Sequence, residues 1–143
     1  MIRKIIPYAR QDINKTDVRS VTKVLKANYI TQGPLVSKFE SAVTKIIGAK
    51  YSIALNSASS ALHVTCIALG LKKGDFLWTS ANTFVSSANC ALHCCAKVDF
   101  IDIDPNTYNI SIDDLKNKLK KAKKIKTLPK IVMPVAFAGQ SCE

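Results

Sequence analysis

Two periods of apolar spacing alternate along the chain from residue 52 onward. Short continuous apolar runs predict four strands, at residues 52–55, 76–79, 97–103 and 131–135. Helical spacing of apolar residues predicts three helices between them, at about 58–69, 83–94 and 113–124. Continuous apolar strands that alternate with helices are typical of a parallel sheet covered on both faces and joined by right-handed crossovers. The pattern therefore predicts an α/β fold with a mostly parallel sheet.

A purely helical pattern precedes the first predicted strand. The segment Asn14–Asp17 resembles a capping box that opens a helix. A turn at Thr31–Pro34 ends this helix, and apolar residues at helical spacing then predict a second helix that ends at Gly48. We therefore expect residues 1–50 to form an N-terminal arm with two helices, distinct from residues 51–143.

The serine-rich stretch Asn56–His63 lies where the first predicted strand runs into a helix. If Ser57 is the N-cap, the backbone N–H groups of Ser59 and Ser60 lie in the first turn without intrahelical partners. Such a turn can hold an anion, and phosphate is the usual one. Serines also cap many helices that bind nothing, so these residues alone leave both interpretations open.

The four predicted strands end in polar turns, and ligands of parallel α/β sheets gather at the carboxyl ends of the strands. These turns are Ser57–Ser60, Thr79–Phe84, Asp102–Asp104 and Phe137–Gln140. No G-x-G-x-x-G and no Walker-type loop follows any strand, which removes the main support for a nicotinamide or nucleoside triphosphate site. The sequence therefore predicts a site at this edge with serines in place of a glycine-rich loop.

An aromatic residue, Phe84, lies in the second of these turns, at the predicted start of a helix. A phenylalanine there is explained by burial in the core. It is also explained, together with Ser59 and Ser60, as the stacking face for a planar phosphorylated ring. The residues alone do not decide between the two.

Length and hydropathy indicate a soluble protein. A chain of 143 residues with 48% hydrophobic residues is long enough for one domain, or a piece of one, with a real core. No apolar run approaches the ~18 residues of a membrane span. The apolar run near the start, at residues 1–7, is shorter than the ~7–15-residue centre of a signal peptide. We therefore expect a cytoplasmic protein that does not bind membranes.

The net charge of +11 raises the question of nucleic-acid binding. Eight lysines fall between Lys116 and Lys130, where Leu115, Leu119 and Ala122 mark the buried stripe of an amphipathic helix. The lysines then occupy the solvent face, and this helix has no aromatic platform or recognition motif among them. The pattern favours a solvated helix over a nucleic-acid site, and a non-catalytic basic binding module remains an alternative.

The five cysteines do not form the loop-rich framework of a disulfide-stabilised protein, so we expect reduced thiols. A metal site is conceivable, because His63 and Cys66 share one helical face and Cys90 and Cys94 another. No CxxC pair exists, and small thiols are ordinary on packed helices. We therefore expect no metal.

Seven motifs follow one another along the chain: YARQDI at 8–13, ITQGP at 30–34, NSASSALH at 56–63, GLKKGD at 70–75, TFVSSANCA at 83–91, VDFIDIDP at 98–105 and PVAFAGQ at 134–140. In order and spacing, these motifs resemble the DegT/DnrJ/StrS family of pyridoxal-phosphate-dependent sugar aminotransferases of fold type I. The resemblance covers essentially the whole chain.

This resemblance implies roles for five residues. Ser59 and Ser60 would hold the phosphate of pyridoxal 5′-phosphate, and Phe84 would stack on its pyridine ring. The family often has threonine at the first phosphate position, and serine keeps the hydroxyl. Thr31 and Gly33 are weaker candidates for the substrate site, because a plain turn explains them equally well.

The resemblance further implies transfer of an amino group from glutamate to a 4-keto sugar nucleotide, for surface-glycan biosynthesis, by a homodimer. The family's cofactor-binding lysine and the aspartate that partners the pyridine nitrogen come from segments beyond residue 143. We therefore expect residues 51–143 to be the first part of an incomplete large domain, and the chain alone to be inactive. Some relatives replace this lysine and act as sugar dehydratases, and that alternative remains open.

Overall fold

The computed structural model describes Pro7 and residues 9–143. The short apolar run at residues 1–7, from which a cytoplasmic location was expected, lies almost entirely outside the described residues. The chain forms two compact units, one that ends at Ala54 and one from Leu55 to Glu143. The domain division expected between residues 50 and 51 stays a prediction.

The first unit contains the two predicted helices, α1 (Lys15–Leu25) and α2 (Pro34–Ile47). The capping box that opens α1 is confirmed, since Asn14 Oδ1 accepts from the Thr16 N–H at 2.7 Å and Asp17 Oδ2 accepts from the Asn14 N–H at 2.8 Å. The predicted end of α2 is also confirmed, because Gly48 adopts a left-handed φ of 68° that favours glycine.

The strand predicted at residues 52–55 is wrong. This segment pairs with none of the described strands. It is tied to α2 instead, through a hydrogen bond of 2.9 Å from the Ala54 N–H to Glu40 Oε1 and one of 3.0 Å between Thr44 and Ser52. An apolar run becomes a strand only beside a paired neighbour, and Ile53 is 77% exposed here.

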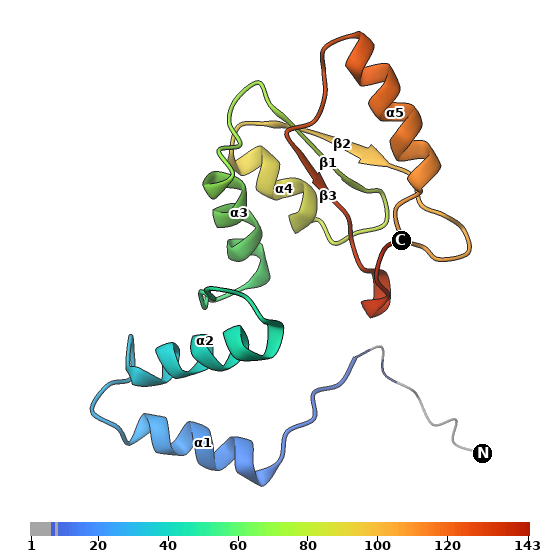
Figure 1. The fold of residues 1–143 in the computed structure, drawn as a ribbon. Helices are drawn as coiled ribbons and strands as arrows, with labels where there is room; N and C mark the ends of the chain where they lie inside the picture. The colour runs from blue at the N-terminus through green and yellow to red at the C-terminus, as the bar shows by residue number, and fades with distance from the viewer. Residues whose placement is uncertain (1–6, 8) are drawn as a thin grey trace, which may run out of the picture. The chain divides into compact units, whose positions relative to one another are not determined.

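The second unit is built on a three-stranded parallel sheet in the order β2-β1-β3 (Figure 1). Its strands are β1 (Phe76–Ser80), β2 (Lys97–Ile101) and β3 (Ile131–Met133). Its helices are α3 (Ala58–Ala68), α4 (Ser86–His93), α5 (Ile112–Lys124) and the short 3₁₀ helix η1 (Phe137–Gly139). The predicted parallel α/β arrangement is therefore confirmed, with three of the four strands.

Both faces of this sheet are covered, as the continuous apolar strands predicted. Leu77 on β1 packs with Cys66 of α3 and Cys90 of α4. The next residue, Trp78, faces the opposite way and packs with Ile101 and Ala122, so α5 covers the second face (Figure 1). The sheet is thus fixed between two helical layers, which holds the carboxyl ends of its strands in place.

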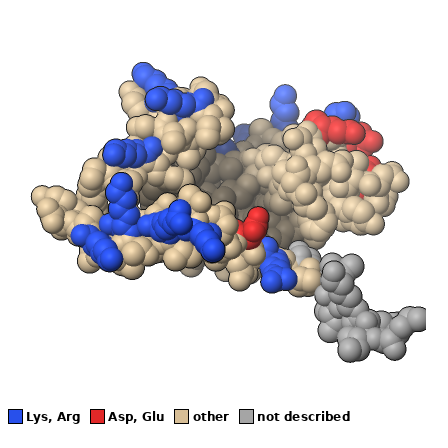
Figure 2. Space-filling view, turned by 90° about the horizontal axis from the view of Figure 1, so that it is seen from below, with Lys and Arg blue, Asp and Glu red and all other residues tan. Residues whose placement is uncertain are grey.

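On the face drawn in Figure 2, Lys and Arg side chains cover more of the surface than Asp and Glu side chains do. The predicted buried stripe of α5 is confirmed, because Ala122 is buried and Leu115 and Leu119 pack against the same core.

Within the described part of the chain, no helix is both long enough and apolar enough to cross a bilayer.

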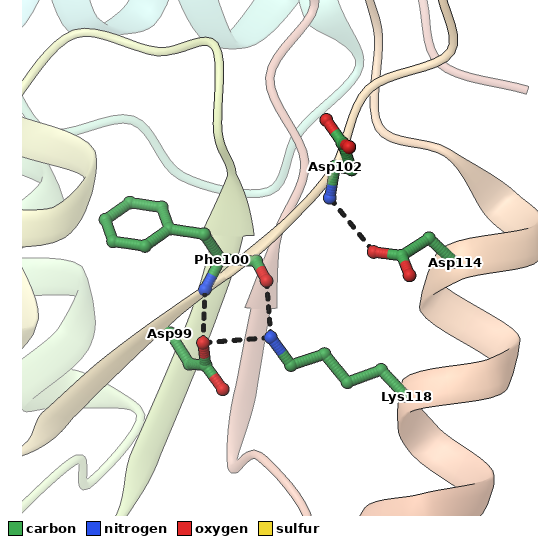
Figure 3. Close-up of polar contacts among 5 residues, drawn as sticks. All are labelled: Asp99, Phe100, Asp102, Asp114 and Lys118. Atoms are coloured by element: carbon green, nitrogen blue, oxygen red, sulfur yellow. Dashed lines mark hydrogen bonds and ion pairs between the residues drawn. The ribbon is translucent and has the colours of Figure 1, made fainter.

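One lysine of α5 does not lie on the solvent face, which corrects the sequence interpretation. Lys118 Nζ lies 2.9 Å from Asp99 Oδ1 on β2 and also donates to the Phe100 carbonyl oxygen (Figure 3). One turn earlier on α5, Asp114 Oδ2 accepts from the Asp102 N–H at 3.0 Å. These contacts attach α5 to the edge strand β2 through polar groups as well as through its apolar stripe.

Candidate functional site

Ser57 is the N-cap of α3, as the sequence predicted. Its backbone is extended, with φ −159° and ψ 157°, and its Oγ accepts from the Ser60 N–H at 3.1 Å. The Ser57 and Ser60 hydroxyl oxygens also lie 3.0 Å apart. The cap therefore fixes the first turn of α3 and places the Ser60 hydroxyl beside it.

The start of α3 has the features of an anion site. The N–H groups of Ala58 and Ser59 belong to the first turn and find no acceptor among the described residues. The first turn carries no acidic side chain that would occupy these donors. Free N–H groups, hydroxyl donors and the positive end of the helix dipole together favour a phosphate-like anion.

A fourth hydroxyl reaches this turn from another helix. The Oγ atoms of Ser59 and Ser86 lie 2.6 Å apart, and Ser86 is the first residue of α4. No pattern in the sequence singles out Ser86. Its only sequence signal is its position just after the polar turn at 79–84. This position does not reveal which helix the side chain faces.

Phe84 is not at the start of a helix, which corrects the prediction. Residues 81–84 form a turn, and α4 begins at Ser86 because Val85 is its N-cap. The turn is held by a hydrogen bond of 2.8 Å from Thr83 Oγ1 to Ser87 Oγ and one of 3.0 Å from the Ser87 N–H to the Phe84 carbonyl oxygen. The side chain of Phe84 is 74% exposed, so the core interpretation is wrong.

The turns after β2 and β3 are joined by Asn109, which the sequence analysis also missed. Asn109 is only 3% exposed, and its amide nitrogen donates to the carbonyl oxygens of Gln140 and Ser141 at 3.2 and 3.1 Å. Its Oδ1 accepts from the Phe137 N–H at 2.9 Å. A buried amide with three partners holds η1 and residues 137–141 against the loop at 104–110.

Thr31 and Gly33 lie in the first unit, in the turn between α1 and α2. Gly33 is the N-cap of α2, and a Cβ atom there would lie 3.1 Å from the Tyr29 carbonyl oxygen. This close approach gives a local reason for glycine. A role of either residue in substrate binding stays a prediction.

Thiols and histidines of α3 and α4 lie close together. The five cysteines carry free thiols, and the His63 and His93 rings lie 5.3 Å apart. Burial, a hydrogen bond with Cys90 and the charges of Cys90 and Cys94 raise the pKa of the Cys66 thiol to about 12. Among the described residues, no three His, Cys, Asp or Glu side chains are grouped to hold a metal ion.

The sequence profile of the DegT/DnrJ/EryC1/StrS aminotransferase family matches residues 11–143. The chain belongs to this family. Aminotransferases of the DegT family depend on pyridoxal 5′-phosphate, and their solved structures include pyridoxal-phosphate and pyridoxamine-phosphate forms. The resemblance drawn from the sequence motifs is confirmed, and the sheet with its two helical layers is part of the aminotransferase fold.

Individual DegT family proteins are similar over nearly the whole chain. The UDP-4-amino-4,6-dideoxy-N-acetyl-β-L-altrosamine transaminase of Campylobacter jejuni is 41% identical over 139 residues, which cover 97% of this chain and 36% of the relative. The structure of PseC from Helicobacter pylori, an aminotransferase involved in pseudoaminic acid biosynthesis, matches with a TM-score of 0.85 at 30% identity, over 98% of this chain and 36% of that one. The pyridoxal-phosphate form of Spr1654 from Streptococcus pneumoniae matches with a TM-score of 0.84 at 26% identity, over 96% and 34% of the two chains.

The chain spans about a third of the length of the curated relatives it matches, since the coverage of the first three is 36%, 34% and 36%. Family membership and fold are therefore shown for the part of an aminotransferase that corresponds to these residues. Activity, substrate and partners of a whole enzyme are inferences from this part.

Proposed function

We propose that this chain supplies the phosphate-binding part of a pyridoxal-phosphate-dependent sugar aminotransferase. The observation that carries the proposal is the start of α3, where Ser59 and Ser60 present hydroxyls beside the free N–H groups of the first turn. These are the donors that a phosphate dianion needs, and the family's cofactor has such a phosphate. The donor set therefore fits the group.

Phe84 would hold the other end of the cofactor. Its ring is exposed on a turn that Thr83 and Ser87 hold in place, so a planar ring can stack on it without displacing core side chains. When bound, the cofactor supplies the electron sink for amino-group transfer, while the chain's own residues bind and orient it. Ser59 and Ser60 would fix its phosphate, and Phe84 the plane of its ring.

For the whole enzyme we propose transfer of an amino group from glutamate to a UDP-linked 4-keto-6-deoxy amino sugar, in the biosynthesis of a surface glycan such as pseudaminic acid. The support is the 41% identity to the Campylobacter transaminase and the fold similarity to PseC. We further propose a cytoplasmic homodimer, with Thr31 and Gly33 near the substrate. The residues that we propose to bind the cofactor and the substrate give no specific support to a dehydratase or to a nucleic-acid binding module.

Binding measurements test the cofactor role directly. The 143-residue chain should bind pyridoxal 5′-phosphate more tightly than pyridoxal, which lacks the phosphate. Ser59→Ala should remove about 1–2 kcal/mol of this difference, since a hydrogen bond to a charged group is lost. Phe84→Ala should weaken both ligands alike. Equal affinity of the unsubstituted chain for the two ligands would contradict the proposal.

Activity measurements test the reaction. The 143-residue chain with pyridoxal 5′-phosphate, glutamate and a UDP-linked 4-keto sugar should give no amino sugar, because we propose that none of its lysines takes the role of the cofactor-binding lysine. A protein that continues this chain to the length of its relatives should give one. Loss of a sugar hydroxyl instead of gain of an amino group would identify a dehydratase.

A further inference from the structure

We propose that Ser86 is a positioning residue of the phosphate site, an inference that rests on the proposed function. In this proposal, the Ser86 hydroxyl donates its proton to Ser59 Oγ. The proton of Ser59 is then directed to the phosphate. Ser86 does not itself touch the phosphate.

The contact between the two hydroxyls is short and joins two helices. Ser59 Oγ and Ser86 Oγ lie 2.6 Å apart, although the residues are 27 positions apart in the sequence. At this distance, one hydroxyl must donate and the other accept. Without a ligand, either direction is possible, because each hydroxyl carries one proton and can also accept.

A phosphate at the start of α3 removes this freedom. The oxygens of a phosphate dianion only accept, so Ser59 must donate its single proton to the anion. Its oxygen can then only accept from Ser86. Ser86 therefore becomes the donor of the pair, which polarises the Ser59 hydroxyl and fixes its rotamer.

The Ser57 and Ser60 hydroxyls, 3.0 Å apart, form a second pair of the same kind within α3. Ser57 Oγ already accepts from the Ser60 N–H, so the proton of Ser57 is free to be donated to Ser60 Oγ. This pair is local to one turn. Of these two pairs, the Ser59–Ser86 pair is the one that connects the phosphate site to another element.

The link to α4 has a consequence for the cofactor ring. Ser86 is two residues after Phe84, and the turn at 81–84 leads directly into α4. The contact therefore couples the residue proposed to hold the phosphate to the turn that carries the proposed stacking ring. One hydroxyl contact would set the spacing between the two ends of the cofactor site.

Three variants test this role. Ser86→Ala should weaken the binding of pyridoxal 5′-phosphate roughly three- to ten-fold, the effect of one hydrogen bond, and should leave pyridoxal binding unchanged. Ser86→Thr keeps the hydroxyl and should restore affinity. Thr65→Ala removes an exposed hydroxyl of α3 away from its start and serves as the matched control. In each variant, the ³¹P shift of the bound phosphate should follow the affinity.

A double-mutant cycle separates positioning from an independent contact. If Ser86 acts through Ser59, then Ser86→Ala should cost nothing further in a Ser59→Ala background. Additive losses of affinity would overturn the inference, and so would a Ser86→Ala variant that binds like Thr65→Ala. In either case, a loss of affinity in Ser59→Ala would still support the proposed function. If the unsubstituted chain does not distinguish pyridoxal 5′-phosphate from pyridoxal, both fail.

Discussion

Lys118 Nζ lies 2.9 Å from Asp99 Oδ1, so an ion pair joins the lysine-rich helix α5 to the edge strand β2. The same ammonium group lies 5.3 Å from the centroid of the Trp78 ring. Lys118 is only 26% exposed, whereas neighbouring lysines of the run point to solvent. The sequence pattern predicts that the lysines of this helix lie on its solvent face, but one of them has a structural role.

Removing this lysine should destabilise the second unit. Lys118→Ala loses a partly buried ion pair and a cation–π contact, which together predict a loss of about 1 kcal/mol in the free energy of unfolding. Lys120→Ala, on an exposed position of the same helix, is the control and should change it by less than about 0.5 kcal/mol. Urea unfolding measures both, and equal stability of the two variants would contradict the structural role.

Asn109 should control the segment at 137–141. Asn109→Ala removes three hydrogen bonds from a residue that is 3% exposed and leaves carbonyl oxygens and the Phe137 N–H unpaired, at a cost of about 2–3 kcal/mol. Hydrogen exchange at the Phe137 amide should accelerate most. Asn106→Ala, on an exposed loop position, should leave this amide protected.

Lowering the pH should weaken the contact between the segment that leads into β1 and the segment that leads into β3. Desolvation raises the pKa of Asp75, but the Lys72 N–H at 3.0 Å and Lys130 Nζ at 3.3 Å outweigh it and lower the pKa below its ordinary value. The stability that the carboxylate contributes is therefore present above about pH 3.9 and is lost as the pH falls through the lowered pKa.

Lys130→Met tests this pKa. It should raise the titration midpoint of the Asp75 carboxyl group, measured by ¹³C NMR, and reduce the loss of stability below about pH 3.9. Lys73→Met removes an exposed charge nearby in the sequence and should leave the midpoint in place. Identical titrations of Asp75 in the two variants would show that the Lys130 contact is not responsible.

The thiols should react in the order of their exposure. Cys66 is fully buried with a pKa raised to about 12, so iodoacetamide at pH 8.5 should not modify it in the folded chain. Cys95 is exposed and should be modified first. Mass spectrometry measures the order, and modification of Cys66 before urea is added would show that the α3–α4 core opens readily.

The edges of the sheet should favour association. In the described three-stranded sheet, β2 and β3 are edge strands, and Phe100 and Val132 on them are 44% and 36% exposed. Unpaired edges with apolar side chains promote pairing between chains. The chain should therefore form larger species as its concentration rises, and Val132→Lys should reduce this. Asn106→Lys adds the same charge away from the edges and should not, as sedimentation can measure.

The sequence by itself determined most of the local elements. The caps of α1, α2 and α3 lie where Asn14, Gly48 and Ser57 predict them, because a cap depends on hydrogen bonds and backbone angles within a few residues. The alternation of periods gave the parallel sheet with two covered faces. The motifs are sufficient to indicate the family without any tertiary geometry.

Only the tertiary structure decided which distant residues meet. Ser86 beside Ser59, Lys118 beside Asp99 and Asn109 beside Phe137 each join elements far apart in sequence, and side-chain packing rather than local pattern sets these contacts. The same reason explains the absent strand at 52–55, since a strand needs a paired neighbour that an apolar run cannot specify. It also explains Phe84, whose exposure depends on where α4 begins.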